Sequence, residues 1–571
     1  MSEEKLIQEF QKAEDVLFNG HQYRITVGVS TCSLAKGADK VLEKTKEEIV
    51  KRGIDANVVR VGCNGMCYSE VNLEIIKRDG SWAVYSYLTP DKVPNVLDAF
   101  FSGSSEYVFA FRRKMGTLKG EEQVPYLTEI PFYGKQTRRI LELVGIIDPL
   151  NVSEYEAFGG YDGLKSALSK TPDEVIDIVK KSMLRGRGGA GFSTGLKWTF
   201  VKNASGNEKY VICNADEGDP GAFMNRLTAE GNPHSIVEGH AIAGYAVGAS
   251  KGYIFVRAEK PLMAEMLSKA IEQARSKGYL GKNIFGTSFS YDIEVILSAG
   301  AFVCGEETAL IAAIEGNRAM PRPRPPYPAT KGLFGKPTLV NNVETLAHVS
   351  YLFRKGLENF ISVGSEKSKG TKVFCLAGNI QCPGAAEVPL GTSLRTLIFD
   401  IGGGVPKGRR FKAVQTGGPS GGCIPEAYLD YALDYETLAS IGSIMGSGGL
   451  VVLDNTSCIV DVARYFLTFT SAESCGQCVP CRIGLQKMLE IMDKIVQGDG
   501  TENDLFLLES WARKVADSSL CALGQTAPNP ILTTLKYFRE EYEEHVRDKK
   551  CRANKCLKLV LKARLPKKII T

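Results

Sequence analysis

Three cysteines in the last quarter of the chain have the spacing of an iron–sulfur ligand set. Cys475, Cys478 and Cys481 form a C-x2-C-x2-C run within ESCGQCVPCR. This spacing can place three thiolates on one side of a tight turn, which suits three corners of a [4Fe–4S] cube, and Cys521 is the candidate fourth ligand. The alternatives are a zinc site, which usually gathers cysteines in pairs separated by a longer loop, or buried thiols without a metal.

Two polar, glycine-rich segments in the middle of the chain have the residue types of a cofactor site. Residues 184–192 (LRGRGGAGF) follow a predicted helix, and their small residues let backbone N–H groups approach a phosphate or a flat ring. Residues 214–221 (NADEGDPG) follow a predicted strand at 210–213, and open α/β sheets place ligands at the carboxyl ends of strands. Each segment alone could be a simple turn.

Three further segments extend this candidate site. GAFVCGEETA (300–309) ends a predicted strand, and NNVET (341–345) opens a predicted helix. PRPRPPYP (321–328) is a stiff loop that can hold one aromatic ring and two arginines in fixed places.

The elements that position these residues must form several domains, because the chain has 571 residues and single cores usually stop growing at about 250–300. No run of about 20 apolar residues predicts a membrane span. The polar start MSEEKLIQEF has no signal-peptide character, and fifteen cysteines then favour a reducing compartment and metal ligation, so we expect a cytoplasmic protein. Nine Lys and Arg without an acid over 549–571 indicate an acidic partner surface or a solvated tail, and no nucleic-acid motif is present.

The ordered motifs RGRGGAGF, NADEGDPG, CGEETAL, PRPRPPYP, NNVET and ESCGQCVPCR resemble the NADH-binding flavoprotein subunit of respiratory complex I. They resemble still more closely the beta subunit of soluble, multisubunit NAD-linked hydrogenases, some of them electron-bifurcating, and the cousins in formate dehydrogenases. The resemblance runs from about residue 124 to 556.

The resemblance implies an FMN site made of residues from these motifs: Gly186, Arg187, Gly188, Lys197, Asn214, Asp216, Glu217, Phe302, Gly305, Glu306, Glu307, Asn341, Asn342 and Thr345. It further implies that NADH stacks on the flavin with help from Phe192, Phe200 and Tyr327. The flavin performs hydride transfer without a catalytic side chain, although Glu217, Asp219 and Glu306 lie nearby. Complex I subunits usually carry Tyr at 302 and Glu at 219, where this chain has Phe302 and Asp219.

The first hundred residues read as a β-α-β opening, with predicted elements at 23–29, 40–52 and 56–61. Cys32 follows the first strand and Cys63 and Cys67 follow the second, so the three could converge on one metal. They resemble the thioredoxin-like [2Fe–2S] domain of electron-transfer subunits. Relatives would carry cysteines near positions 28 and 33, where this chain has Gly28 and Ser33. Either Ser33 or another donor completes the cluster, or the domain has lost its metal.

We therefore expect an α/β multidomain protein with a Rossmann-like flavin domain and a β-grasp-like (SLBB) domain before a carboxyl-terminal helical bundle. The expected units are a thioredoxin-like domain, a linker, the FMN and NADH domain, the β-grasp-like domain, the helical [4Fe–4S] domain and a basic tail, at 1–105, 106–123, 124–365, 366–455, 456–556 and 557–571. Cys375, Cys382 and Cys423 share no ligand pattern and are expected to be structural.

Three cysteines and one histidine in the carboxyl-terminal part of the chain predict a closed zinc site. Cys458, His545, Cys551 and Cys556 supply three sulfurs and one imidazole if folding brings Cys458 near the others. The alternative is a frayed helix end with free thiols.

These features together predict an NAD(H)-reactive subunit of a multisubunit oxidoreductase. The implied partners are a thioredoxin-like [2Fe–2S] small subunit and a large iron–sulfur subunit of a hydrogenase, which exchanges electrons with ferredoxin if the assembly bifurcates. The nearest alternative is the diaphorase subunit of a formate dehydrogenase. A non-catalytic docking subunit is the alternative of a different class, and the retained flavin and cluster motifs argue against it.

Overall fold

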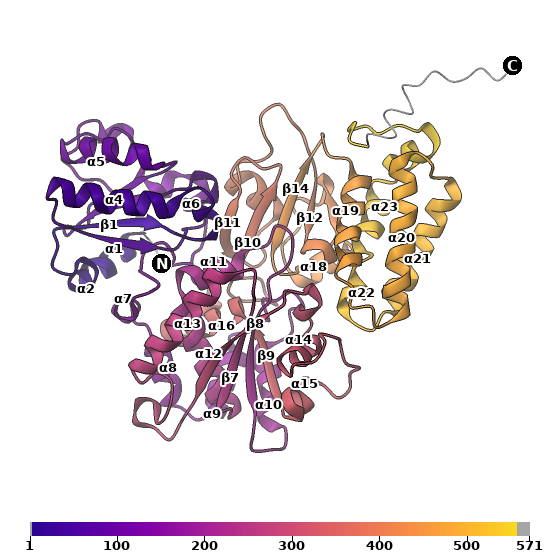
Figure 1. Cartoon of the computed structure of the whole chain (residues 1–571), viewed down its shortest axis with the longest axis horizontal. Helices are drawn as coiled ribbons and strands as arrows, with labels where there is room; N and C mark the ends of the chain where they lie inside the picture. Colours follow the sequence, from indigo (N-terminus) through magenta and orange to yellow (C-terminus); the bar gives the residue numbers. More distant parts are fainter. Residues whose placement is uncertain (1–2, 557–571) are drawn as a thin grey trace.

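The computed structural model describes residues 3–556, so the predicted basic tail at 557–571 lies outside the described part of the chain. Figure 1 shows an amino-terminal α/β unit at one end of the molecule, two sheet-containing units in the middle and a group of helices at the other end. This arrangement confirms the predicted α/β multidomain class. Within residues 3–556, no helix is both long enough and apolar enough to cross a membrane.

The amino-terminal sheet has the strand order β2-β1-β3-β4-β5. Its elements are β1 (Tyr23–Gly28), α4 (Ala38–Arg52), β2 (Ala56–Val61), β3 (Leu73–Lys77), β4 (Trp82–Tyr85), α5 (Val93–Phe101) and β5 (Ala110–Arg113). Parallel pairing of β1 with β2 confirms the predicted β-α-β opening. The prediction of a linker over 106–123 is wrong, because β5 pairs with β4 and so belongs to this sheet.

The central sheet contains four parallel strands in the order β8-β7-β6-β9. They are β6 (Tyr210–Ala215), β7 (Lys251–Arg257), β8 (Asp292–Ser298) and β9 (Thr338–Asn342). In the sheet, β7 and then β8 lie on one side of β6, and β9 lies on the other side of β6. The strand order therefore reverses between β6 and β9, and such a reversal is where open α/β sheets bind ligands.

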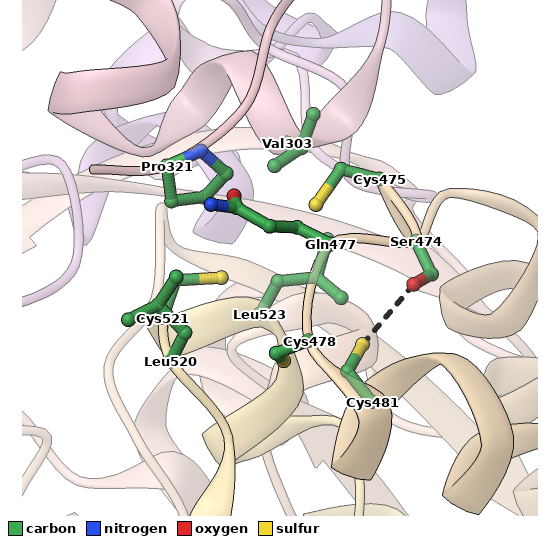
Figure 2. Close-up of a pocket in the computed structure, with 10 residues that line it drawn as sticks. All are labelled: Val303, Pro321, Ser474, Cys475, Gln477, Cys478, Cys481, Leu520, Cys521 and Leu523. Carbon is green, nitrogen blue, oxygen red and sulfur yellow. Dashed lines mark hydrogen bonds between the residues drawn. The ribbon is translucent and has the colours of Figure 1, made fainter. Parts of the chain in front are cut away.

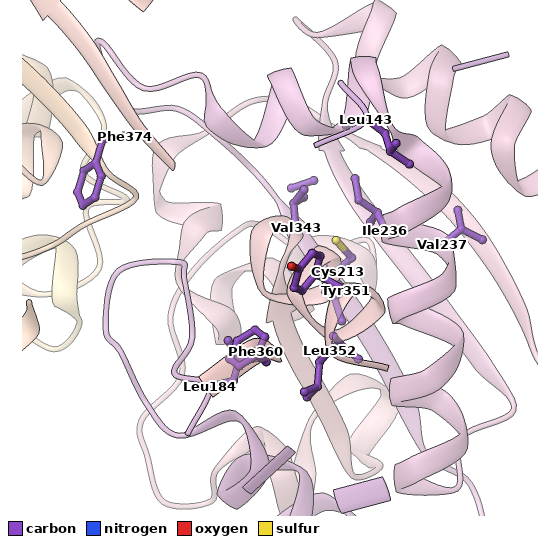
Figure 3. Packing of buried hydrophobic residues seen from close by; sticks show 14 of the residues in the cluster. Leu143, Leu184, Cys213, Ile236, Val237, Val343, Tyr351, Leu352, Phe360 and Phe374 are labelled. Carbon is purple, nitrogen blue, oxygen red and sulfur yellow. The ribbon is translucent and has the colours of Figure 1, made fainter. Parts of the chain in front are cut away.

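Helices cover this parallel sheet, as buried parallel strands require. They include α9 (Pro172–Lys181), α10 (Thr194–Asn203), α12 (Pro233–Val247), α13 (Pro261–Ser276) and α16 (Val343–Lys355). Figure 3 shows the core beneath them, where Cys213 of β6 lies among Ile236 of α12 and Val343 of α16. This core holds the carboxyl ends of β6 and β9 in fixed positions.

The next unit is a five-stranded sheet in the order β11-β10-β14-β12-β13. Its strands are β10 (Thr371–Gly378), β11 (Gly384–Pro389), β12 (Phe411–Thr416), β13 (Cys423–Pro425) and β14 (Gly449–Asp454). The first and last strands are central and parallel, and each is flanked by antiparallel strands, which is the predicted β-grasp arrangement. Cys375 and Cys423 are fully buried within it.

The carboxyl-terminal part is helical. It contains α19 (Ile459–Ala472), α20 (Val479–Gln497), α21 (Glu502–Ser518), α22 (Ala522–Thr526), α23 (Asn529–Tyr537) and α24 (Arg539–Glu543). A single helix over 529–546 is predicted, but the chain leaves helical geometry at Phe538, with φ −132° and ψ 32°. The short α24 and a π-helical turn at Glu544–Asp548 follow, and this turn carries His545.

Candidate functional site

Asparagines at the carboxyl ends of β6 and β9 form the base of the candidate site. Asn214 donates a hydrogen bond from Nδ2 to the carbonyl oxygen of Gly305 at 3.0 Å, and its Oδ1 accepts from the N–H of Asp216 at 3.1 Å. Asn342 lies against the glycine-rich loop, since a Cβ atom added at Gly188 would stand 3.2 Å from the Asn342 Cβ. The motifs predicted to form one site therefore meet where the strand order reverses.

Helix α10 contributes two side chains that join this base to neighbouring segments. Lys197 pairs with Glu307, with 3.1 Å between Nζ and Oε2, and Arg324 approaches the other Glu307 oxygen at 3.4 Å. The Trp198 indole N–H donates to Asn341 Oδ1 at 2.9 Å. These contacts bring the PRPRPPYP loop and the ends of two helices to the same edge of the sheet.

Arg187 braces the glycine-rich loop through bonds to backbone. Its guanidinium is buried and donates to three carbonyl oxygens, those of Arg185, Thr371 and Lys369, at 2.9, 3.0 and 2.7 Å. Its N–H donates to the Thr345 hydroxyl at 2.8 Å, and the Tyr435 hydroxyl donates to the Gly186 carbonyl at 2.8 Å. The Arg187 side chain, predicted to contact FMN, is thus occupied in holding the loop against the β-grasp-like unit.

Asp216 and Arg257 carry buried polar atoms that the described protein does not satisfy. The Asp216 carboxylate pairs with Arg257 Nε at 3.5 Å, and Glu259 pairs with the same nitrogen at 3.2 Å. Neither Asp216 oxygen accepts a hydrogen bond, and Arg257 Nε and Nη1 donate none. Burial raises the pKa of Asp216 to about 7. Buried polar groups are nearly always hydrogen-bonded, so these atoms call for a bound partner with its own donors and acceptors. The ring edge and ribityl hydroxyls of FMN supply both.

Arg257 is a residue that the sequence interpretation missed. It ends β7, one strand away from the reversal point, and it lies outside every recognisable motif. The only available signal was its place at the carboxyl end of an apolar parallel strand, where α/β sheets gather ligand-binding side chains.

The acidic side chains expected near the reacting atoms have structural partners. Glu217 is buried and accepts from two N–H groups in the first turn of α11 (Met224–Gly231), at 2.7 and 3.1 Å. Glu306 accepts from two N–H groups at the start of α14 (Glu307–Ile314), at 3.0 and 2.9 Å. Ser447 donates to Asp219 at 2.5 Å, and burial raises the pKa of Asp219 to about 6. These contacts fix the side chains of Glu217 and Glu306 against the first turns of α11 and α14.

Three aromatic rings predicted to stack on a dinucleotide lie at the surface. Phe192 and Phe200 are each 48% exposed and Tyr327 is 57% exposed. The rings of Phe192 and Phe200 lie 6.4 Å apart between centroids. Large apolar side chains gathered at a surface mark a contact site for a ligand or partner.

Phe302 links the flavin-side loop to the helical part. It begins the short 3-10 helix η6 (Phe302–Gly305), and its ring packs on Phe469 of α19 at 5.3 Å between centroids. Its N–H donates to Glu473 at 2.8 Å. Because Glu473 directly precedes the cysteine run, this contact ties that run to the loop that also supplies Gly305.

Figure 2 shows the four predicted cluster cysteines around one pocket. Cys475, Cys478, Cys481 and Cys521 line it together with Val303, Pro321, Ser474, Gln477, Leu520 and Leu523. The apolar lining excludes water, and burial raises the pKa of the Cys481 thiol to about 11. These four cysteines do not form a group whose sulfurs all lie within 4.8 Å, unlike two other sets in the described chain. The wider spacing fits a cube better than a single ion.

Cys458, His545, Cys551 and Cys556 come together as predicted. Their four ligand atoms lie within 4.8 Å of one another and all four residues are buried. Cys458 Sγ is 3.4 Å from His545 Nε2 and 3.7 Å from Cys556 Sγ. The other ring nitrogen, Nδ1, bonds to the Glu541 carbonyl oxygen at 2.6 Å, which leaves Nε2 free to bind a metal. Three sulfurs and one imidazole in this closed geometry fit tetrahedral zinc.

Cys32, Cys63 and Cys67 also converge, with all three sulfurs within 4.8 Å of one another. Ser33 does not join them, because its hydroxyl donates to the Ser30 carbonyl at 3.1 Å and accepts the Ser30 N–H at 2.8 Å. A metal bound by these three thiols alone would have three protein ligands and would lack a fourth.

Two segments of the chain match described families. Residues 179–351 match the Nuo51 FMN-binding domain, and residues 461–545 match the NADH-ubiquinone oxidoreductase-F iron-sulfur binding region. The first range spans the glycine-rich loop and the ends of all four parallel strands. The second spans the four cysteines of the pocket in Figure 2.

Longer similarities cover most of the chain. The HndC subunit of the NADP-reducing hydrogenase of Solidesulfovibrio fructosivorans is 55% identical over 426 residues, which is 75% of this chain and 87% of that protein. An F-type subunit of the NADH-quinone oxidoreductase of Rhizobium meliloti is 43% identical over 413 residues, or 72% of this chain and 98% of that protein. A crystal structure of NAD+-reducing [NiFe]-hydrogenase in the H2-reduced state aligns with TM-score 0.65 and 27% identity, covering 96% of this chain and 90% of the other.

Proposed function

The chain belongs to the family of the F-type subunits of NADH-quinone oxidoreductases and their hydrogenase relatives, and from this premise we propose that it is the NAD(H)-reactive subunit of a multisubunit hydrogenase. As a member of this family it is an NADH-binding flavoprotein with an FMN-binding domain and a [4Fe–4S] region. The hydrogenase assembly is favoured over a formate dehydrogenase because hydrogenase proteins stand among the similar sequences and the similar structures.

The observation that carries the proposal is the unsatisfied Asp216–Arg257 pair at the reversal of the strand order. It lies at the base of the predicted FMN site, and η6 connects that site to the four-cysteine pocket through Phe302 and Val303. When bound, FMN supplies two-electron exchange with NAD(H) and one-electron exchange with an iron–sulfur cluster.

The chain's own residues bind and orient these groups. Gly186 and Gly188 let backbone approach the flavin phosphate, Lys197 supplies positive charge, and Asp216 and Arg257 bond to polar atoms of the cofactor. Exposed Phe192, Phe200 and Tyr327 stack on the dinucleotide. The remaining predicted FMN residues (Arg187, Asn214, Glu217, Phe302, Gly305, Glu306, Glu307, Asn341, Asn342 and Thr345) shape and hold the surrounding loops.

Two further metal centres belong to the proposal. Zinc is held by Cys458, His545, Cys551 and Cys556, where it closes the carboxyl-terminal helices around one ion. The thioredoxin-like domain holds an iron–sulfur centre, proposed as [2Fe–2S], through Cys32, Cys63 and Cys67.

The proposed assembly contains a small thioredoxin-like [2Fe–2S] subunit and a large iron–sulfur hydrogenase subunit, with ferredoxin as a further electron carrier. A cytoplasmic location agrees with fifteen free cysteines and no disulfide among them. The proposal keeps the predicted domain boundaries as predictions, with the thioredoxin-like domain extended through β5 to at least residue 113.

Anaerobic visible spectra of the purified chain, with flavin, iron and zinc counted, test this function. We expect one FMN and at least four irons per chain, with bleaching on addition of NADH. In the purified complex, hydrogen-dependent and not formate-dependent NAD+ reduction is expected. A chain with neither flavin nor iron after anaerobic reconstitution would refute the proposal.

A further inference from the structure

A buried glutamate stands beside the three amino-terminal cysteines. Glu70 follows Cys67 by three residues and is only 4% exposed. Cys63 and Cys67 have their sulfurs 3.9 Å apart, as two ligands of one metal atom would. The buried Glu70 side chain is therefore close in the chain to a partly assembled metal site, but its carboxylate is not among the ligand atoms that all lie within 4.8 Å of one another.

The carboxylate occupies space that the sequence leaves open at position 28. A Cβ atom built at Gly28 would stand 3.5 Å from Glu70 Oε2 and 3.8 Å from Oε1. A cysteine is expected near this position from the thioredoxin-like pattern, and glycine provides no ligand. Glu70 brings an anionic oxygen close to where a side chain from position 28 would begin.

Within residues 3–556, few polar groups stabilise the charge of the buried Glu70 carboxylate. Glu70 Oε1 has no hydrogen-bond partner, and Oε2 accepts from the Asn72 N–H at 3.3 Å. Lys36 attracts its charge from a distance, but none of the ion pairs formed within residues 3–556 includes Glu70. A buried, unpaired carboxylate is costly unless it is protonated or coordinates a metal.

We propose that Glu70 is the fourth ligand of the amino-terminal metal centre, completing the set Cys32, Cys63 and Cys67. This inference rests on the proposed presence of a metal in that domain. Three thiolates and one carboxylate carry the same total charge as four thiolates, so the substitution preserves the charge of the centre while making one ligand harder. Ser33 is excluded from this role because its hydroxyl is committed to Ser30.

Neighbouring units hold the loop beside the site, where Cys63 is buried and Cys32 and Cys67 are partly exposed. A Cβ atom at Gly62 would stand 2.5 Å from the Gly231 Cα at the end of α11, and the Gly65 carbonyl accepts from the Ala385 N–H at 2.9 Å. Both contacts pin the loop that bears Cys63 and Cys67.

The test compares full-length variants by metal content per chain and by low-temperature EPR after reduction. Cys32→Ala defines the signal and the metal that belong to this centre, because alanine offers no ligand atom. Glu70→Gln should lose most of that metal, whereas Glu70→Cys should keep it with a shifted spectrum. Glu230→Gln is the matched control, because Glu230 is buried near Cys32 but bonds to Thr31 and should leave the metal unchanged.

The outcomes separate the inference from its premise. If wild type and Cys32→Ala hold the same metals, the domain has no centre and both ideas fail. If wild type holds extra metal and Glu70→Gln holds as much with an unchanged spectrum, only the ligand assignment fails. Thermal melting of each variant distinguishes loss of a ligand from loss of the fold, and a folded Glu70→Cys chain with an unaltered spectrum would also overturn the assignment.

Discussion

Replacing Arg187 is expected to loosen the glycine-rich loop, and lysine should be no better a substitute than alanine. The guanidinium is 1% exposed and bonds to three backbone carbonyls from two different units. Lysine keeps the charge but cannot reproduce three donors in a planar fork. If Arg187 served mainly as a charge for the flavin phosphate, lysine would instead be tolerated.

The structure sets the expected size of this effect. A hydrogen bond from a charged donor contributes about 1.5–3 kcal/mol, and the three carbonyls would be left buried without their partner. Because such contributions do not add fully, we expect a loss of about 4 kcal/mol for Arg187→Ala. For a unit of about 150–250 residues this lowers Tm by about 8–16 °C.

The assay is thermal melting together with FMN content of the full-length protein after gel filtration. Arg187→Ala and Arg187→Lys should both lower Tm and lose FMN. Lys369→Ala is the control, since only the Lys369 carbonyl accepts from Arg187 and the side chain is not needed. The bracing role would be refuted if Arg187→Lys kept the Tm and FMN content of the wild type while Arg187→Ala lost both.

Three other changes have defined outcomes. Cys521→Ser should remove about four irons per chain while FMN stays bound, because the cysteine lines the cluster pocket and not the flavin site; iron and flavin counts check this. His545→Ala should abolish zinc binding and lower Tm, and a variant that retains one zinc per chain by elemental analysis contradicts the site. Burial lowers the pKa of His234 and His240 from the ordinary value of 6.5 to about 4. Below pH 6.5 the unfolded chain therefore binds more protons than the folded chain, and the free energy of unfolding decreases as the pH is lowered. The two groups contribute a slope of up to about 2.7 kcal/mol per pH unit, and His240→Gln should halve that contribution in melts between pH 6.5 and 4.

Sequence alone predicted those parts of the fold whose pattern is local. The strand at 56–61 has the predicted bounds, because its hydrophobic pattern marks it within the segment itself. Three of the ligand motifs were also predictable, since NADEGDPG and GAFVCGEETA follow strands and NNVET opens a helix. Their meeting at one sheet edge follows from the parallel order of the strands.

Features that depend on distant partners could not be read from the sequence. Strand β5 has four residues, and only its pairing with β4 makes it a strand. The break at Phe538 interrupts a sequence with helical periodicity, and packing of α23 and α24 imposes it. Arg257 and Glu70 belong to no motif, and their importance is evident only from unsatisfied atoms in the folded chain.

The wall of the cluster pocket has a consequence for how the protein matures. Val303 and Pro321 complete a pocket whose cysteines lie more than 150 residues later in the chain. Because synthesis proceeds from the amino terminus, this wall leaves the ribosome and can fold before the cysteines emerge. A cluster held by the four cysteines is therefore covered by residues from both halves of the polypeptide, so its shielding from solvent depends on the docking of those halves.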